Sequence, residues 1–196
     1  MTSPDSLSPN QREVAFLTLV YNKFYDIFEE LFSEGFNIAN SYYRYERINQ
    51  LLSIYCEILK YTPLTYMIED MKTKRPPMEA ELASEFVNII RHVIVHFRIF
   101  DNWDEVWIQK DIVTWKKEGR QIDKFFRKYE GHQPVKARFW EQRRKKMTCA
   151  AISFPSGYSA GDKIYLKDMI SEFDGVRLIA ILLRQVINTQ VESITE

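Results

Sequence analysis

The chain has few of the residues on which several classes of protein depend. Its 196 residues include only two cysteines, Cys56 and Cys149, which lie far apart and lack the short spacing of a metal-binding pair. We therefore expect two reduced thiols rather than a disulfide or a zinc site. The six glycines form neither a GxxxxGK nor a GxGxxG motif, which disfavours ATP-driven and dinucleotide chemistry. Gly157 and Gly161 are interpreted as turn residues, and a serine nucleophile of the GxSxG type is disfavoured.

Long apolar runs are also missing. The longest extends only from Leu178 to Leu183, and the first five residues lack a basic start followed by an apolar stretch. A membrane-spanning helix needs about 20 apolar residues, and a secretory leader needs an apolar segment of its own. The sequence therefore predicts a cytoplasmic protein with no membrane partner.

Net charge is zero, because 27 basic residues balance 27 acidic ones, but the charges are unevenly distributed. The segment from Lys116 to Lys146 contains 12 Lys or Arg residues and 4 acidic residues, which gives it a net charge of +8. Such a segment attracts RNA phosphates or an acidic, antitoxin-like protein, and charge alone does not decide between them. The expected RNA-binding residues are Lys116, Lys117, Arg120, Arg143, Arg144, Lys145 and Lys146.

Aromatic residues are interleaved with this basic charge. They are Phe125, Phe126, Tyr129, Phe139 and Trp140. Exposed aromatic rings beside cations suit base stacking in RNA binding. The alternative is that these rings belong to the hydrophobic core while the cations coat the opposite face.

The spacing of apolar residues predicts a mainly α protein with a single domain over residues 1–196. We expect an antiparallel helical bundle, a flexible leader at residues 1–8, and a β-hairpin over residues 147–166 before the C-terminal helix. In the hairpin, Met147–Phe154 pairs with Lys163–Leu166. The expected helices run from Pro9 to near Gly35, from about Ile38 to Tyr61, from Glu79 through His96, from Trp103 toward Gly119 or Gly131, from Pro134 to Lys146, and from about Asp168 to Thr189. Asn102 is the expected N-cap of the helix at Trp103, because Glu105 completes a capping box.

Two of the three histidines, His92 and His96, fall on one predicted helix beside Arg91. On a helical wheel, Arg91 lies about 120° and His96 about 100° from the centre of the apolar arc, on opposite sides, and His92 lies about 140° away. Val95 also points outward, at about 160°. An outward valine among polar groups suggests a second contact surface, so we expect a partner subunit to cover this face.

The pattern of Arg91, the polar residue His92, three further positions and His96, on a late helix of a small bundle, resembles the signature of the HEPN superfamily. The resemblance covers the helical portion of the chain. It implies a HEPN-type bundle and a ribonuclease that dimerises without a metal or other cofactor, so that two motifs face a shared cleft. Many such proteins are toxins or act in phage defence.

The chemistry of these side chains fits that implication. An imidazole can take the proton of an RNA 2′-hydroxyl, and an arginine can stabilise the charge on the phosphorane oxygens. We assign His96 as general base or acid, Arg91 as phosphate ligand, and His92 as a positioning or second proton-transfer group. Arg91 and His96 are about 140° apart on one helix, so we expect a second subunit to bring an arginine and a histidine to one phosphate.

Three other interpretations stay open. The side chains could pair structurally at a dimer interface. His92 and His96, four residues apart, could bind a metal, although no HExxH pattern and no third ligand is evident. The chain could also be a non-catalytic interaction module of a toxin–antitoxin or mobile-element system.

Overall fold

The computed structural model describes residues 11–58, 61, 77–109, 119–131, 134–141, 145–159 and 161–195. Within these residues the protein is mostly helical, with two small antiparallel pairs of strands. The predicted leader at residues 1–8 lies outside the described residues. No helix in the described part is long and apolar enough to cross a bilayer.

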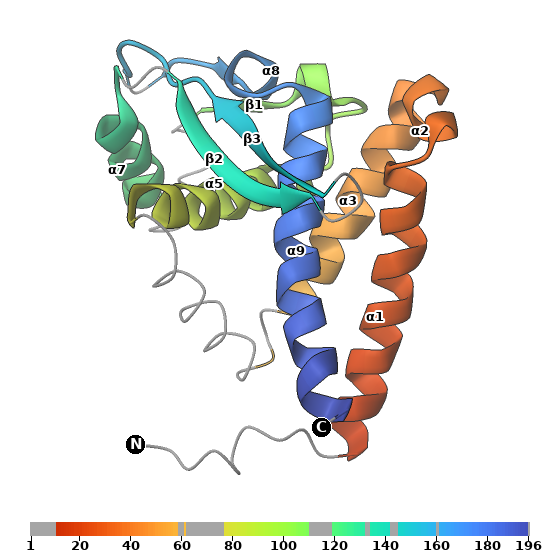
Figure 1. Ribbon diagram of the computed structural model, residues 1–196. Helices are drawn as coiled ribbons and strands as arrows, with labels where there is room; N and C mark the ends of the chain where they lie inside the picture. Colours follow the sequence, from red (N-terminus) through yellow and green to blue (C-terminus); the bar gives the residue numbers. More distant parts are fainter. Residues whose placement is uncertain are drawn as a thin grey trace.

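Three long helices, α1 (Gln11–Leu31), α3 (Ser41–Ile58) and α9 (Glu172–Thr195), lie side by side (Figure 1). α1 and α3 are antiparallel, and the short helix α2 (Glu34–Ile38) connects them. Ser33 caps α2, since its hydroxyl accepts a hydrogen bond from the Phe36 amide. The first helix therefore ends at Leu31, and Gly35 belongs to α2 rather than marking the end of α1.

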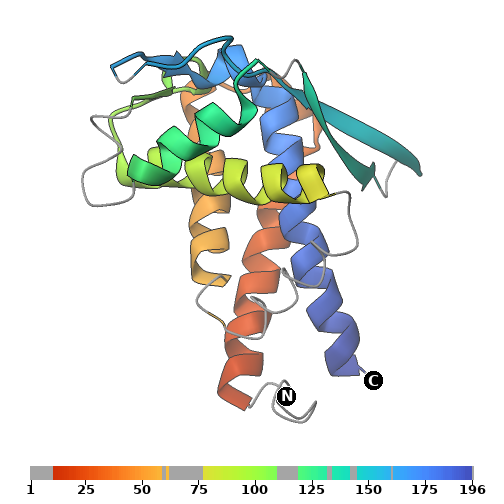
Figure 2. The same cartoon turned by 90° about the vertical axis from the view of Figure 1, so that its left-hand side faces the viewer.

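Helix α5 (Pro77–His96) lies across this group (Figure 2), in contact with α3 and with strand β2 (Val135–Glu141). Helix α7 (Gly119–Tyr129) runs along it, and Phe86 of α5 stacks on Phe125 of α7 with ring centroids 6.2 Å apart. The predicted apolar arc of α5 is buried at five positions and half-buried at Phe97; the five are Leu82, Phe86, Ile90, Val93 and Ile94. Val87 and Ile89 are buried as well, because neighbours cover α5 on more than one side.

The strands pair differently from the prediction. β2 pairs with β3 (Lys146–Ile152), from Val135 opposite Ile152 to Glu141 opposite Lys146. The predicted helix over 134–146 is therefore wrong. Small and apolar side chains alternate there with Lys136, Arg138 and Trp140, and this period of two buries one face of a strand.

The predicted hairpin is wrong in its pairing, although both of its segments contain strands. β4 (Ile164–Tyr165) pairs with β1 (Trp107–Ile108), and not with β3. Asn102 is a cap as predicted, with its side chain accepting from the Glu105 amide, but it starts only one 3-10 turn, η2 (Trp103–Glu105). The chain then turns extended, because β1 pairs with β4 and the Leu166 amide donates to the Val106 carbonyl at 2.8 Å.

The predicted C-terminal helix is divided into α8 (Leu166–Met169) and α9. Two hydrogen bonds fix the break. The Ile170 carbonyl accepts from the indole Nε1 of Trp103 at 3.1 Å, and Ser171 Oγ accepts from the Asp174 amide at 3.1 Å. The break between α8 and α9 therefore places the start of α9 against Trp103.

Arg44 of α3 and Glu172 of α9 form a bidentate ion pair, with Nε–Oε1 and Nη2–Oε2 distances of 2.6 and 2.9 Å. Arg44 Nη1 also donates to the Ala39 carbonyl at 2.6 Å. We expect Arg44→Ala to lower the free energy of unfolding by about 1–3 kcal/mol, because it removes charge-assisted hydrogen bonds from a partly buried site. Chemical denaturation measures this loss. Arg44→Lys should recover little of the lost stability, since an ammonium does not make the bidentate contact. Full recovery by lysine would contradict a stabilising role for the bidentate ion pair.

Tyr45 has a buried side chain, only 3% exposed, and its hydroxyl has no hydrogen-bond partner in the described part of the chain. Burial, with a smaller contribution from the charges of Glu46, Asp101 and Glu105, raises its pKa above the ordinary value of 10.0. Above that pH the unfolded tyrosine ionises while the folded one stays neutral, so stability is lost as pH rises.

We therefore expect the wild-type melting temperature to fall between about pH 9 and pH 11, and Tyr45→Phe to weaken that fall. At neutral pH, Tyr45→Phe should leave stability unchanged or slightly higher, because it removes an unpaired buried hydroxyl. Thermal melts across this pH range test both points. The exposed Tyr42→Phe is the control, and an equal effect of the two variants would contradict the assignment to Tyr45.

Candidate functional site

The candidate site lies on the last turns of α5. We call Glu85, Asn88, Arg91, His92 and His96 the α5 polar face. The helix is regular up to His96, and the Phe97 amide still donates to the Val93 carbonyl at 3.0 Å. The helical-wheel positions of Arg91, His92 and His96 therefore apply, and all three lie off the buried arc.

The two histidines of the α5 polar face are neighbours. Their ring centroids are 4.8 Å apart, and His92 also makes an edge contact with the Phe97 ring, with centroids 6.3 Å apart. His96 is exposed and His92 is half-buried. The His96 imidazole is thus accessible to a ligand, while the His92 imidazole packs against His96 and Phe97. Two adjacent imidazoles are suited to proton transfer.

Arg91 occupies the flank of α5 that faces α3. Burial raises the pKa of Tyr55 in α3, and the positive charge of Arg91 acts against that rise, which puts the guanidinium near the phenol. The Nε atom of Arg91 is buried and has no hydrogen-bond partner among the described residues. Arg91 and His96 are therefore separated within one chain, as the helical wheel predicts.

Val95 differs from the prediction. It is half-buried and packs against the hydrophobic core instead of pointing freely outward. It lies next to Arg91 on the helical wheel, on the flank that α3 covers. Val95 therefore does not support a second contact surface.

The other end of the α5 polar face is tied to α7. Tyr129 donates a hydrogen bond to the Glu85 carboxylate at 3.3 Å, and Lys128 lies 3.6 Å from the same oxygen. These contacts fix the start of the face. The histidines, two to three turns further along, lie beyond them.

The structure tests only part of the predicted basic surface. Lys145 and Lys146 are exposed at the turn between β2 and β3, and Lys145 adopts a positive φ of 49°. Arg120 lies in α7, but its side chain is outside the described part. Lys116, Lys117, Arg143 and Arg144 also fall outside the described residues. The structure thus places two of the seven side chains.

The side chain of Phe139 lies outside the described part, and the other four aromatic residues of the basic segment divide into two groups. Phe125, Phe126 and Tyr129 are buried in the core, so for them the core interpretation is correct. Trp140 is 46% exposed on β2. Stacking on a base is therefore open to Trp140 and not to the three rings of α7.

The segment from Gly157 to Gly161 matches the GxSxG pattern, although from the sequence both glycines are interpreted only as turn residues. A serine nucleophile of this type sits on a sharp turn between a strand and a helix. Ser159 instead lies in the loop between β3 and β4, where its amide donates to Asp162 Oδ2 at 2.9 Å and its carbonyl accepts from the Asp162 amide. The local geometry is that of a turn.

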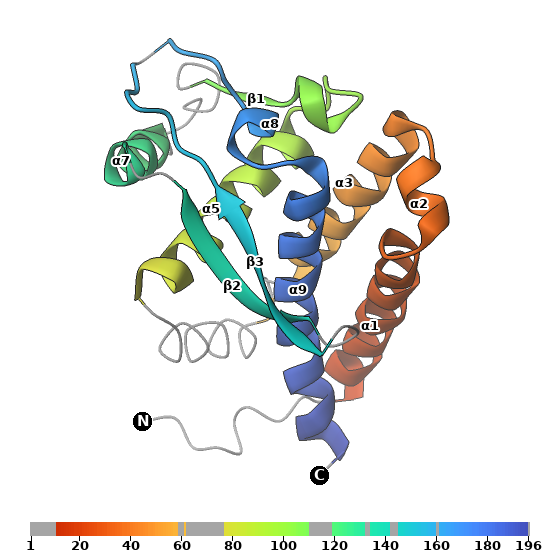
Figure 3. The same ribbon diagram turned by 45° about the horizontal axis from the view of Figure 1, so that its top comes forward.

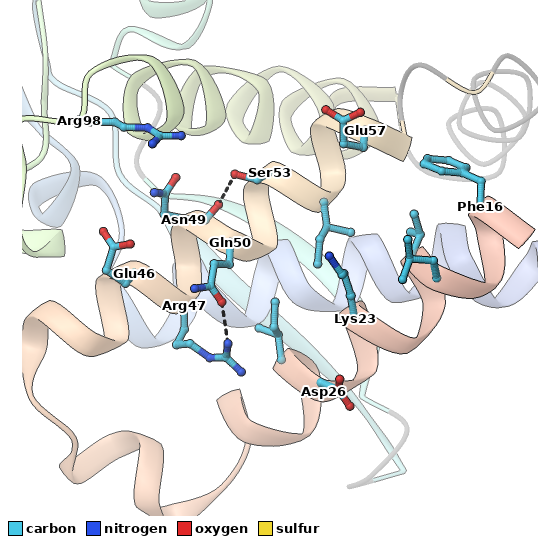
Figure 4. Close-up of a pocket in the computed structure, with 14 residues that line it drawn as sticks. Phe16, Lys23, Asp26, Glu46, Arg47, Asn49, Gln50, Ser53, Glu57 and Arg98 are labelled. Carbon is cyan, nitrogen blue, oxygen red and sulfur yellow. Dashed lines mark hydrogen bonds between the residues drawn. The ribbon is translucent and has the colours of Figure 1, made fainter.

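A groove of about 720 Å³ between α1 and α3 is a feature that the sequence did not predict (Figure 4). Apolar side chains such as Phe16 and Leu19 line it together with three cations and three acids. The charged residues are Lys23, Arg47, Arg98, Asp26, Glu46 and Glu57. Because the charges balance, the groove has no preference for an anionic or a cationic ligand. Its residues come from α1, from α3 and, in the case of Arg98, from the segment after α5, so only tertiary packing brings them together.

The described residues contain no group of three or more His, Cys, Asp or Glu side chains arranged to hold a metal ion. Comparison with protein-family models, curated proteins and solved structures finds no match. What the structure defines is a mostly helical protein with two small antiparallel sheets and a polar helix face that carries two adjacent histidines. Function therefore has to be argued from that face.

Proposed function

We propose that this protein is a metal-independent ribonuclease that cleaves RNA by attack of a 2′-hydroxyl at a cleft between two copies of the chain. The observation that carries the proposal is the pair of adjacent imidazoles, His92 and His96, on the accessible end of the α5 polar face. The proposal also rests on the resemblance to HEPN proteins, whose bundle we propose for the helical part of this chain.

The reaction needs one group to remove a proton and another to supply one. The 2′-oxygen attacks the phosphorus and loses its proton to a base, while the departing 5′-oxygen receives a proton from an acid, leaving a cyclic phosphate. His96 is exposed and takes the role of base or acid. His92, in contact with it, positions the first ring or transfers the second proton.

Arg91 supplies the positive charge that stabilises the phosphorane. Within one chain it lies toward α3, about 140° from His96 around the helix. A second copy that packs its own α5 polar face against the first would bring the partner's arginine to a phosphate held at His96. This geometry favours a homodimer with a shared site.

Incubation of the purified protein with mixed cellular RNA, at low salt and with a chelator, tests the proposal. Wild type should degrade the RNA, and Arg91→Ala and His96→Ala should leave it intact. The nuclease assignment fails if all three proteins leave the RNA equally intact.

A second candidate is a non-catalytic interaction module of a toxin–antitoxin or mobile-element system, with an antitoxin-like protein as partner. The partial burial of Arg91, whose positive charge lowers the pKa of buried Tyr55, favours it, since an arginine packed toward α3 can have a structural role. In this case Arg91→Ala lowers the stability of the protein, and RNA stays intact with wild type, Arg91→Ala and His96→Ala alike.

A further inference from the structure

The β2–β3 hairpin has two faces of different character. On its inner face Val135, Ala137, Ala150 and Ile152 are buried, and the hairpin lies over α5 and α9 (Figure 3). Its outer face is exposed along its whole length. The residues of that outer face are Lys136, Arg138 and Trp140 on β2, opposite Ala151, Cys149 and Met147 on β3.

The outer face combines positive charge with exposed apolar surface. Lys136, Arg138 and Trp140 occupy every second position of β2, and none of the six outer positions of the hairpin is acidic. Trp140 and Met147 are opposite each other near the turn, 46% and 60% exposed. Lys145 and Lys146 add two exposed cations at the same end.

We propose that this outer face binds single-stranded RNA, with the cations on the phosphates and Trp140 stacked on a base. The inference rests on the proposed function, because it names how that enzyme holds its substrate. It adds Lys136 and Arg138 to the expected RNA-binding residues and assigns base stacking to Trp140.

Charge and shape favour a single strand as the occupant. From Lys136 to Trp140 the strand advances about 13 Å, enough to follow a few nucleotides of an extended backbone. A large exposed indole beside cations matches the stacking platforms of proteins that bind single strands, where each stacked base contributes about 1–3 kcal/mol. An acidic protein surface would use the cations but would gain little from the exposed ring.

Binding of a labelled oligouridine with 2′-O-methyl groups tests the inference, because this probe cannot be cleaved by 2′-hydroxyl attack. Trp140→Ala should weaken binding about tenfold, and Trp140→Phe should retain most of it, since a smaller ring still stacks. The double variant K136Q/R138Q should also bind more weakly, with a shallower salt dependence. Lys167→Gln on α8 removes an exposed cation that is not part of the hairpin and should change nothing.

Cys149 gives a second measurement that does not depend on substitutions in the hairpin. It is exposed on the outer face opposite Arg138. In a Cys56→Ser background, bound oligouridine should slow the reaction of Cys149 with a maleimide. An unchanged rate at saturating oligouridine would overturn the placement.

The outcomes separate this inference from the proposed function. Equal binding by wild type and by all hairpin variants, or no binding by wild type, overturns the inference. Polyglutamate competing as well as the oligouridine also overturns it, in favour of an acidic protein. Intact hairpin binding without any cleavage of ordinary RNA would instead refute the nuclease and leave the hairpin as the RNA-binding surface.

Discussion

His96→Ala is expected to lower the rate of RNA cleavage by about 10²–10⁴-fold, the usual contribution of a general acid or base. His96 is exposed at the end of α5, so its removal should leave the melting temperature nearly unchanged. Single-turnover cleavage of a short RNA, measured together with a thermal melt, checks both statements.

The matched control for the arginine of the site is Arg98, which lies seven residues after Arg91, beyond the end of α5, and lines the α1–α3 groove instead. Arg98→Ala should cleave RNA at the wild-type rate, whereas Arg91→Ala should not. If removal of either arginine slows cleavage equally, general positive charge explains the effect, and the assignment to the α5 polar face is wrong.

Gly175→Ala is expected to destabilise the protein by about 1–3 kcal/mol, the range found for overpacked cores. A Cβ atom at Gly175 would lie 2.5 Å from both Cη2 and Cζ2 of Trp103. The indole has little room to move, because it is only 1% exposed and its Nε1 donates to the Ile170 carbonyl. Chemical denaturation should show a lower midpoint.

Ordinary helix propensity predicts the opposite sign, since alanine is favoured over glycine by about 1 kcal/mol inside a helix. Gly35→Ala in α2 is the control, because the nearest atom to its added Cβ is Ser33 Oγ at 3.8 Å. Trp103→Phe should partly rescue Gly175→Ala by removing the atoms that clash. A stabilised Gly175→Ala protein would contradict this close packing of Trp103 on α9.

The helices with regular apolar spacing could be predicted from sequence. In α3, the helical spacing of apolar residues predicts one buried side, and its six described members are all buried because this helix packs one consistent face inward. They are Tyr45, Ile48, Leu51, Leu52, Tyr55 and Ile58. On α5 the predicted arc was too narrow. Val87 and Ile89 are buried by neighbours that helical spacing does not reveal.

Strand pairing was less predictable. β1 and β4 are two residues long and more than fifty residues apart, so no local pattern links them. β2 was mistaken for a helix because charged and aromatic residues obscure the alternation of Val135 and Ala137 with Lys136 and Arg138. Pairing with β3 and burial against α5 and α9 determine its conformation.

The candidate site was predicted only as far as one helix allows. The contact between the imidazoles of His92 and His96 follows from their spacing of four residues. The position of Arg91 beside Tyr55 does not, because it depends on which helix packs against α5. The same packing half-buries Val95, and the groove between α1 and α3 arises from tertiary contacts in the same way.

A mixed dimer tests the central claim, that one RNA site is built from the α5 polar faces of two copies. Arg91→Ala and His96→Ala chains with different tags are co-expressed, and the dimer carrying both tags is purified. One of its two sites then has an intact arginine and an intact histidine, so we predict about half of the wild-type cleavage rate from two inactive parents. A mixed dimer that is folded but no more active than its parents would contradict the shared site.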